Sequence, residues 1–553
     1  MSDALKSKIA DVFDEPGCDH NVNKEERQRK KGCAKPLTPG AAAGGCAFDG
    51  AKIALQPIVD VAHLVHAPLA CEGNGWDNRG AASSGSERYR TGFTTDLTEL
   101  DIVMGHGERK LYRALREVIE AEQPPAVFVY ATCVPALIGD DIHAVCKAAT
   151  QTFGTPCIPV NAPGFVGSKN LGNKLAGEAM LDHVIGTVEP AETTPYDINI
   201  VGDYNLSGEL WQVKPLLDRL GIRILGSLAA DARYKQVAMM HRAKVTMMVC
   251  SKALINVARK LEERYGIPYF EGSFYGISDT SEALRTMCRM LVERGADAAL
   301  LDRCEALIAE EEAAIWAQLE PFRPRVAGRR VLLYTGGHKS WSVVAALQEL
   351  GMEVIGTSVR KATEEDKGRV VEIMGDDKHM FDNMAPKDMY RLLKEAGADL
   401  LMSGGRSQFV ALKAKMPWVD VNQEKHEPYA GYMGMVDLLR AIDRAVNNPM
   451  WEELRSPAPW DTPLEQGAIL PAHRGACPVT GVPAAATARP VTYAPGEAAG
   501  DLPPHAATVM PNGAASLAEA PPSSVTPSFP TSPTLSPAAL SALPSSTTDF
   551  EDC

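Results

Sequence analysis

Three cysteines stand where the local sequence would offer a thiolate to a metal. Cys46 follows a Gly-Gly pair and opens a helical pattern of apolar residues that runs to about residue 66. Cys71 ends that pattern in a glycine-rich turn, and Cys133 follows a β-branched and aromatic run that predicts a buried strand. Helix N-termini and N–H groups freed by glycine favour thiolates, as an iron–sulfur cluster requires. We therefore predict an iron–sulfur site with three cysteine ligands, which leaves one iron atom open to another ligand.

The spacing of these cysteines leaves a second interpretation open. The intervals from 46 to 71 and from 71 to 133 are much longer than the compact spacing of a CxxC motif. Unligated cysteines are among the most buried residue types, so three structural core thiols are the alternative.

The composition indicates an acidic globular protein. The chain has 553 residues, 45% of them hydrophobic and 23% charged, and a formal net charge of −14. This charge predicts no DNA or RNA partner. No apolar run is long enough to span a membrane and the N-terminus is too polar for a signal peptide, so we expect a cytoplasmic protein. In that reducing compartment the 12 cysteines are interpreted as metal ligands and unpaired thiols, not as disulfides.

Alternating strand runs and helical patterns predict α/β units with parallel sheets, followed by a tail. The predicted boundaries are an N-terminal arm at 1–43, α/β units at 44–190, 191–325 and 326–460, and a tail at 461–553. Within the first unit, residues 97–123 read as one long helix. The tail holds 16 of the 39 prolines and has no periodic apolar face, so we expect it to be disordered.

Most other cysteines carry no ligand motif. Cys18, His20 and Cys33 in the arm lack paired ligand spacing, so an unliganded arm is the preferred interpretation. The remaining cysteines that we interpret as core or exposed thiols are Cys146, Cys157, Cys288, Cys304, Cys477 and Cys553.

Glycine-rich loops with a cation follow three of the predicted strands. Lys169 lies in GFVGSKNLGNK, Lys339 follows the pair Gly336-Gly337, and Arg406 follows another Gly-Gly pair. Because α/β sheets bind ligands at the carboxyl ends of their strands, the loops with Lys339 and Arg406 would surround a polyanionic cluster or an organic acid. The GFVGSKNLGNK loop, which enters a helix, could cradle an anion. Dinucleotide binding is a weaker alternative because GxGxxG is absent, and the cations also fit plain solvation.

Several motifs resemble those of one protein family. GGCAFDGAK, HAPLAC…WDNRG and CVPALIGDDI look like the cluster-cysteine segments of α-type subunits in the nitrogenase component 1 superfamily. The segments DEPGCDHN, GCAKP, GSKNLGNK and TGGHKSWSVV are closest to its branch of scaffold proteins, on which the iron–molybdenum cofactor is finished. The resemblance covers roughly residues 8–447.

The resemblance implies an architecture and partners. Three Rossmann-like domains would surround a cofactor cavity, and the chain would pair with a homologous NifN-type β subunit in an α2β2 heterotetramer. A fourth ligand from that partner would complete a [4Fe–4S] cluster on Cys46, Cys71 and Cys133 at the subunit interface. NifB would donate the precursor cluster, the nitrogenase Fe protein would deliver molybdenum and electrons, and apo-nitrogenase would accept the product.

The resemblance also implies a second, exchangeable cluster site. Cys250 closes a predicted strand beside two methionines, where a core thiol is the alternative, but its segment is similar to the one that holds the cofactor in the catalytic chain. That chain's histidine ligand, in PYHGF, corresponds to Ala430 in PYAGY, and His426 is a less favoured substitute. The positions matching cofactor-neighbouring residues are Arg79, Lys169, Asn173, Lys339 and Arg406.

We therefore expect a scaffold subunit that holds an iron–sulfur precursor while molybdenum and homocitrate are added, and then releases it to apo-nitrogenase. Whether it also acts as an enzyme stays open. One alternative is a catalytic reductase of the same superfamily, either the nitrogenase α-chain, which Ala430 argues against, or dark-operative protochlorophyllide reductase, which Cys250 argues against. The other is a metal-free Rossmann-type binding protein, which would be colourless when purified without oxygen.

Overall fold

The computed structural model describes most of the chain between residues 45 and 457. The described ranges are 45–77, 90–203, 207–249, 251–336, 339–359, 362–375, 380–381, 384–422 and 425–457. The predicted arm, the predicted tail, Arg79 and Cys250 lie outside these ranges. By their contacts the residues fall into two units, Met1–Ala468 and Ile469–Cys553, and every described residue belongs to the first.

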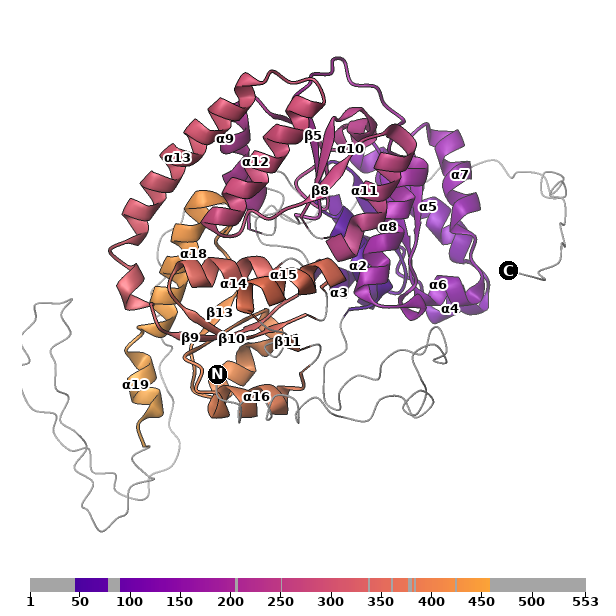
Figure 1. Cartoon of the computed structure of the whole chain (residues 1–553). Helices are drawn as coiled ribbons and strands as arrows, with labels where there is room; N and C mark the ends of the chain where they lie inside the picture. Colours follow the sequence, from indigo (N-terminus) through magenta and orange to yellow (C-terminus); the bar gives the residue numbers. More distant parts are fainter. Residues whose placement is uncertain are drawn as a thin grey trace, which may run out of the picture. The chain divides into compact units, whose positions relative to one another are not determined.

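The first sheet has four parallel strands in the order β2-β1-β3-β4. The strands are β1 (Ala62–His66), β2 (Arg90–Thr94), β3 (Val127–Ala131) and β4 (Cys157–Asn161). Helices α5 (Gly107–Glu122) and α7 (Ile142–Phe153) cover one face, and α2 (Ala47–Leu55) and α8 (Lys169–His183) cover the other (Figure 1). Successive residues point to opposite faces, so Val129 packs under the first pair of helices and Tyr130 under the second.

The second and third sheets are also parallel, in the orders β6-β5-β7-β8 and β11-β10-β9-β12-β13. The second is built from β5 (Asp197–Val201), β6 (Arg223–Leu228), β7 (Val245–Met248) and β8 (Tyr269–Glu271), with α9 (Glu209–Leu220), α10 (Tyr234–Met239), α11 (Ser251–Tyr265), α12 (Ile277–Glu293) and α13 (Ala299–Leu319). The third is built from β9 (Arg330–Tyr334), β10 (Glu353–Ser358), β11 (Met380–Phe381), β12 (Leu400–Ser403) and β13 (Trp418–Asp420), with α14 (Lys339–Glu349), α15 (Glu364–Met374), α16 (Pro386–Glu395), α17 (Gln408–Lys413), α18 (Gly431–Val446) and α19 (Met450–Arg455).

One apolar core serves both of these sheets. Helix α18 packs against α9, α12 and α13, and residues of both sheets, such as Ile198 and Val331, belong to a single buried cluster. No helix in the described part of the chain is long and apolar enough to cross a bilayer.

Each sheet reverses its strand order beside its first strand, between β1 and β3, between β5 and β7, and between β9 and β12. In α/β sheets, ligands bind outside the carboxyl ends of the strands at such switch points. Cys71 and Cys133 follow β1 and β3, and Lys339 and Arg406 follow β9 and β12. The predicted fold class of parallel α/β sheets is confirmed, and these four predicted site residues fall at two of its switch points.

Two predicted helices differ from the structure. The apolar pattern from Cys46 to about residue 66 is helix α2 followed by strand β1, because Pro57 disfavours helix at the preceding residue and short apolar runs do not separate helix from strand. Residues 97–123 form two helices, α4 (Glu99–Val103) and α5, because Gly105 adopts a φ of +65° between them.

Candidate metal centre and cofactor site

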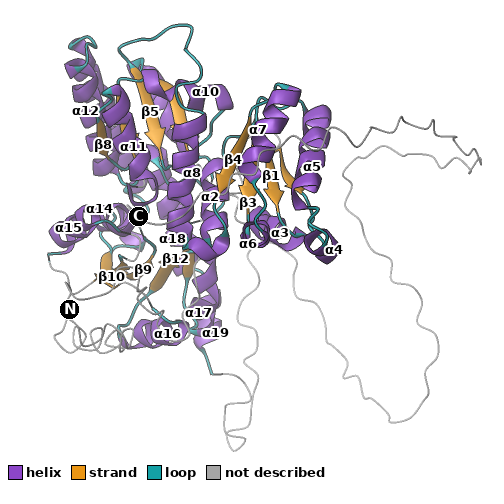
Figure 2. Ribbon diagram, turned by 90° about the vertical axis from the view of Figure 1, so that its right-hand side faces the viewer, coloured by secondary structure: helices purple, strands orange, loops and turns teal. Residues whose placement is uncertain are grey.

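The three predicted cysteine ligands converge at the switch point of the first sheet, where α2, α3 and α6 meet the ends of β1 and β3 (Figure 2). Cys46 directly precedes α2, Cys71 lies in the first turn of α3 (Leu69–Asp77), and Cys133 begins α6 (Cys133–Ile138). The sulfur atoms of Cys133 and Cys46 lie 3.0 and 3.2 Å from the point that a Cβ on Gly164 would occupy. The electrostatic influence of both thiols reaches Cys71, and all three cysteines are half-buried.

Glycine allows the helices at this site to approach closely. A Cβ on Gly50 would lie 1.9 Å from the carbonyl oxygen of Lys169, and a Cβ on Gly172 would lie 1.7 Å from that of Ala47. Helices α2 and α8 therefore pack with their backbones in contact, which any larger residue at these positions would prevent. The N–H of Lys169 also donates to the carbonyl oxygen of Gly45 at 2.8 Å, so the start of α8 is fixed beside Cys46.

Burial opposes ionisation of Cys46 and Cys71. Burial raises the pKa of Cys46, and a hydrogen bond from the Asp49 backbone lowers it by less. Burial likewise raises the pKa of Cys71, and a hydrogen bond with the Thr132 side chain lowers it by less. This direction is opposite to the prediction that the local backbone favours thiolates, because burial outweighs the hydrogen bonds. A metal cation, which displaces thiol protons when it binds, is therefore needed to hold them as thiolates. Among the described residues, no three His, Cys, Asp or Glu side chains are arranged to hold one metal ion.

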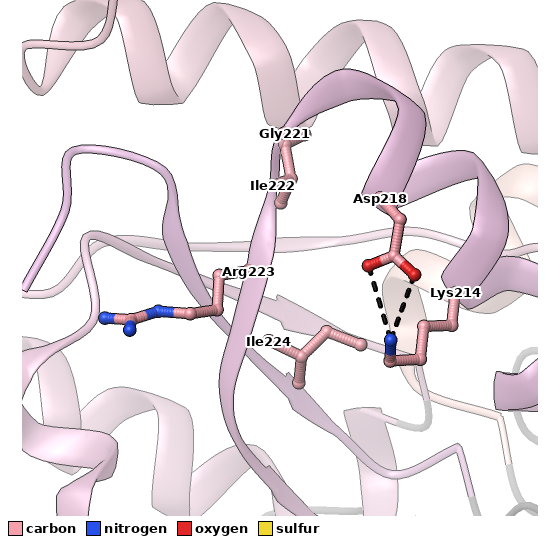
Figure 3. Close-up of a pocket in the computed structure, with 6 residues that line it drawn as sticks. All are labelled: Lys214, Asp218, Gly221, Ile222, Arg223 and Ile224. Atoms are coloured by element: carbon pink, nitrogen blue, oxygen red, sulfur yellow. Dashed lines mark hydrogen bonds and ion pairs between the residues drawn. The ribbon is translucent and has the colours of Figure 1, made fainter.

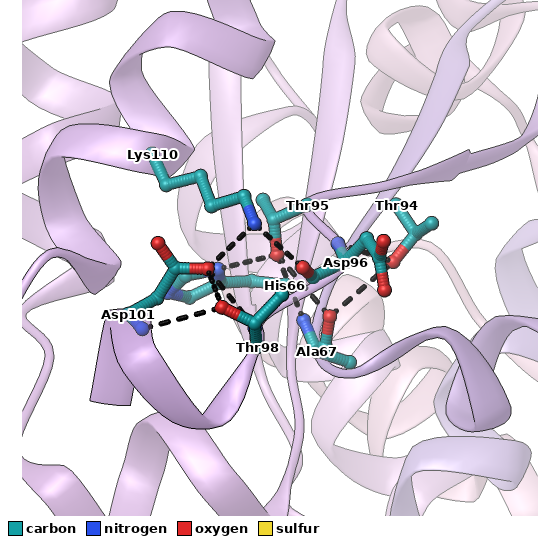
Figure 4. Close-up of polar contacts among 8 residues, drawn as sticks. All are labelled: His66, Ala67, Thr94, Thr95, Asp96, Thr98, Asp101 and Lys110. Carbon is teal, nitrogen blue, oxygen red and sulfur yellow. Dashed lines mark hydrogen bonds and ion pairs between the residues drawn. The ribbon is translucent and has the colours of Figure 1, made fainter. Parts of the chain in front are cut away.

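Polar contacts fix the segments that carry Cys71 and Cys133. The buried ring of His66, at the end of β1, lies 3.0 Å from Thr95 Oγ1, and the same hydroxyl accepts the N–H of Ala67 at 3.1 Å (Figure 4). The other ring nitrogen lies 3.0 Å from Asp140 Oδ2, just after α6. His66 therefore joins the chain before Cys71 to the chain after Cys133.

Two buried polar contacts lie close to these segments, one between α2 and α3 and one between β1 and β3. Lys52 and Glu72 form an ion pair with both side chains buried, and burial lowers the pKa of Lys52, which the charge of Glu72 opposes. His63 Nδ1 lies 2.8 Å from Tyr130 Oη, and its Nε2 lies 3.1 Å from the carbonyl oxygen of Ile58. Burial, with the charge of Lys52, lowers the pKa of His63 to about 3, so the ring is neutral at physiological pH.

Lys169 and Asn173, predicted as cofactor neighbours, lie one turn apart at the start of α8, on the side of the cysteines. The Cε of Lys169 is 2.9 Å from the point that a Cβ on Gly45 would occupy. Asn173 is buried, and its Oδ1 has no hydrogen-bond partner within the described ranges. The structure thus brings these two residues to the same place as Cys46.

Lys339 and Arg406 lie at the switch point of the third sheet, in different surroundings. Lys339 is buried; its Nζ donates to the carbonyl oxygen of Val421 at 2.7 Å and lies 5.0 Å from the centre of the Tyr275 ring. It therefore joins two parts of the protein, whereas the sequence predicted a loop lysine directed at a ligand. Arg406 is exposed in the short helix η5 (Gly405–Ser407).

Ala430 is fully buried within the apolar core, directly before α18. His426, four residues earlier, is exposed. The position that matches a histidine ligand in the catalytic chain therefore offers only a methyl group here. Arg79 and Cys250 lie outside the described residues, and their roles stay predictions.

Two functional candidates were missed by the sequence analysis. Lys425 and Glu209 form an ion pair; Lys425 is 3% exposed and Glu209 is 1% exposed. Lys425 lies in the polar segment NQEKHE, which is typical of a surface turn, and Glu209 reads as an ordinary acidic residue at a helix start. No local signal distinguishes either residue, because the contact joins distant parts of the chain.

A surface pocket lies at the amino end of β6 in the second sheet, away from the carboxyl ends of its strands (Figure 3). It is lined by Lys214, Asp218, Gly221, Ile222, Arg223 and Ile224. The ammonium of Lys214 pairs with the carboxylate of Asp218 at 2.9 Å, and Arg223 begins β6. Because α/β sheets bind ligands at the carboxyl ends of their strands, we assign this pocket no part in the site.

Comparisons with known proteins agree with this geometry. The profile of the family described as "Nitrogenase component 1 type Oxidoreductase" matches residues 46–447. The chain is 76% identical over 469 residues to "Nitrogenase iron-molybdenum cofactor biosynthesis protein NifE" of Rhodobacter capsulatus, covering 85% of this chain and 98% of the relative. It is 65% identical to the protein of the same name in Mesorhizobium japonicum, covering 86% and 96%. The solved structure "Nitrogenase Cp1 at pH 6.5" superimposes with a TM-score of 0.72 at 26% identity, over 82% of this chain and 99% of that one.

Proposed function

This chain belongs to the family of nitrogenase component 1 type oxidoreductases, and from that membership we propose that it is a scaffold subunit for biosynthesis of the iron–molybdenum cofactor. It holds an iron–sulfur precursor while molybdenum and homocitrate are added, and then releases the product to apo-nitrogenase. The names of its relatives support a role in cofactor biosynthesis. The observation that carries the proposal is the convergence of three thiols at the first switch point, together with a buried methyl group at Ala430.

Cys46, Cys71 and Cys133 hold a permanent [4Fe–4S] cluster in this proposal. Glycine at position 164 leaves room beside two of the sulfur atoms, where a Cβ would touch both. Half-buried thiols whose pKa is raised by burial need a metal to become thiolates, which fits cluster ligands. The cluster, when bound, supplies electron transfer; the protein supplies three thiolates and keeps them at fixed positions.

A β-type partner subunit, of the NifN type, supplies the fourth ligand and covers the surroundings of the cysteines. Large apolar side chains are exposed close to each of them in the sequence or the structure: Leu69 is 61% exposed, Leu137 is 73% exposed and Phe165 is 57% exposed. Leu69 precedes Cys71 by two residues, Leu137 shares α6 with Cys133, and Phe165 follows Gly164. Apolar side chains gathered around half-buried ligands fit a subunit interface.

In this proposal the exchangeable site extends from the first switch point toward those of the second and third sheets, and Cys250, which follows β7 in the sequence, holds one end of the precursor. Lys339 and Arg406 at the third switch point, Lys169 beside Cys46, and Arg79 supply positive charge, which suits an anionic cluster with homocitrate. Cofactor delivery then involves NifB as donor, the nitrogenase Fe protein as source of molybdenum and electrons, and apo-nitrogenase as acceptor. Ala430 offers no second strong ligand, so the cargo leaves more readily than from a catalytic subunit. A catalytic reductase is the less favoured function because both the relatives' names and Ala430 argue against it.

The permanent cluster can be tested by single Ala substitutions at Cys46, Cys71 and Cys133. Each is expected to lower the iron content by a similar amount and to weaken association with the partner subunit, because one missing ligand opens the shared group. Iron and sulfide would be measured after purification without oxygen, and association by gel filtration. Cys146→Ala, which removes a buried thiol from a different apolar cluster, is the control. Unchanged iron in all three ligand variants would contradict the proposal.

The release step can be tested at Ala430 and Cys250. Cys250→Ala is expected to keep the permanent cluster and lose stable precursor loading, whereas Ala430→His is expected to retain the cargo and slow its transfer to cofactor-free nitrogenase. Because Ala430 is fully buried, Ala430→Leu adds bulk without an imidazole and controls for altered packing. Transfer by Ala430→His at the parent rate, or equal slowing by Ala430→Leu, would show that ligation at this position does not govern release.

A further inference from the structure

A buried ion pair joins the loop of residues 421–431 to the second sheet. Lys425 belongs to this loop, which connects β13 to α18 and carries Ala430. Glu209 is the first residue of α9, which follows β5 of the second sheet. The two side chains are almost completely buried and pair directly. The contact therefore bridges the units built on the second and third sheets.

Neighbouring groups hold both members of the pair. The hydroxyl of Ser207 donates to the carbonyl oxygen of Lys425 at 2.7 Å, and the N–H of Ser207 donates to Glu209 Oε2 at 2.8 Å. The hydroxyl of Tyr275 donates to Glu209 Oε1 at 3.4 Å, and the ammonium of Lys425 lies 5.1 Å from the centre of the Tyr429 ring. The carboxylate of Glu209 is thus oriented by Ser207 and Tyr275, and the ammonium of Lys425 is oriented by Tyr429 of its own loop.

Hydrogen bonds to backbone and side-chain groups fix the two ends of the loop. At its beginning, the carbonyl oxygen of Val421 accepts Lys339 Nζ at 2.7 Å, and the side chains of Asn422 and Thr335 are hydrogen-bonded at 3.0 Å. At its end, the N–H of Gly431 donates to the carbonyl oxygen of Phe274 at 2.7 Å. Between these ends, two buried side chains of the described part of the loop reach the second sheet and its helices: Tyr429 through the shared apolar core, and Lys425 through its ion pair.

A buried charge pair responds strongly to the loss of either partner. Taking an ammonium out of water is costly: burial lowers the pKa of Lys425 to about 7, and the charge of Asp203 opposes this shift. Removing Lys425 takes the buried counter-charge away from Glu209, and removing Glu209 leaves Lys425 without its direct partner, with only the more distant influence of Asp203. The exposed pair of Glu427 on the loop and Arg444 on α18 is largely screened by solvent. The two ion pairs of one loop therefore differ in their expected effect on its position.

We propose that Lys425 and Glu209 are a positioning pair that holds the described segment 425–431, and with it Ala430, against the start of α9. Separation of the two charges releases residues 425–430, while Gly431 stays bonded to Phe274. The inference that the pair holds this segment in place depends only on the contacts described above. Its role in cargo passage rests on the proposed function, because it takes the loop as one wall of the exchangeable site.

The test is hydrogen exchange of the backbone amides of residues 425–431 in the full chain, purified without oxygen. Lys425→Met and Glu209→Gln are each expected to speed this exchange by about tenfold or more, because each removes the direct partner of one buried charge. The double variant is expected to exchange more slowly than either single variant, since no unpaired charge remains. Glu427→Gln, which breaks the exposed pair of the same loop, is the matched control and should stay within about twofold of the parent. Amides of β1 and β3 report whether the fold is intact.

Three results would overturn the positioning role: parent-like exchange in both single variants, purely additive effects in the double variant, or an equal effect of Glu427→Gln. Transfer of cargo to cofactor-free nitrogenase is measured on the same samples and is expected to be faster in the single variants. If loop exchange rises as expected but the parent protein loads no iron–sulfur cargo, the proposed function fails and the positioning pair stands.

Discussion

Two junctions in this protein are built in opposite ways. At the cysteine junction, where α2 and α8 meet beside Cys46, the backbones touch because Gly50 and Gly172 have no side chains. At the charged junction, where the loop of residues 421–431 meets α9, the ion pair of Lys425 and Glu209 supplies the contact. The first is fixed by sterics and the second by electrostatics.

The difference matches what each place has to do in the proposed function. Backbone contact between two helices cannot be released without moving the helices, so it suits three ligands of a permanent cluster that must keep their spacing. A pair of opposite charges can separate while the elements that carry them stay folded, so it suits the border of a site that loads and releases cargo. The three predictions that follow test this contrast, from the largest expected effect to the smallest.

The largest effect is expected from filling the cysteine junction. Gly50→Ala or Gly172→Ala places a Cβ within 2 Å of a carbonyl oxygen, at 1.9 and 1.7 Å, so α2 and α8 must separate. We expect a loss of at least about 3 kcal/mol in the free energy of unfolding, together with loss of iron. Chemical denaturation would measure the stability. Gly73→Ala is the control, because nothing lies within 4 Å of its added Cβ, and it should cause no loss. A small effect at Gly50 and Gly172 would mean that the two helices yield easily.

A smaller effect is expected from the neutral polar group beside the cysteine junction. The pKa of His63 is about 3 in the folded protein and about 6.5 in an unfolded chain, so between these values the unfolded state binds more protons. His63 therefore favours the folded state fully above pH 6.5 and less as the pH falls, by about 1.4 kcal/mol per pH unit. Comparing unfolding at pH 6 and pH 4, the parent should lose about 2–3 kcal/mol more than His63→Gln. His183→Gln, at an exposed position, should behave like the parent. Identical pH dependence in the parent and in His63→Gln would show that His63 does not contribute to the pH dependence of stability.

The smallest effect is expected from removing the chain beyond both junctions. Truncation after Trp460 removes residues 461–553, whose sequence has no periodic apolar face. Thermal stability and cofactor maturation should stay unchanged, the stability within about 0.5 kcal/mol. Thermal unfolding and iron content of the truncated and full chains would be compared. A marked loss of partner association after truncation would show that the tail takes part in a contact that neither junction supplies.

Local sequence was enough to predict the parallel α/β fold and the neighbourhood of the cysteines. The run before Cys133 predicts a buried strand, and the carboxyl end of such a strand is a ligand position whatever packs around it. Local pattern was insufficient where a short apolar run fits two structures. The predicted helix from Cys46 onward was wrong beyond Leu55, because pairing of β1 with β3, which are far apart in the chain, makes those residues a strand.

What the sequence by itself determined, then, is the set of elements and the residue types at their ends, since strand runs, glycine turns and proline breaks act over a few residues. Tertiary structure alone decided that the pKa of Cys46 and of Cys71 is raised, because burial is the main cause and no local motif encodes burial. It also decided the role of Lys425, whose carbonyl oxygen binds a serine 218 residues earlier in the chain. Nothing in the segment around Lys425 reveals this contact, because it forms only when the second and third sheets pack together.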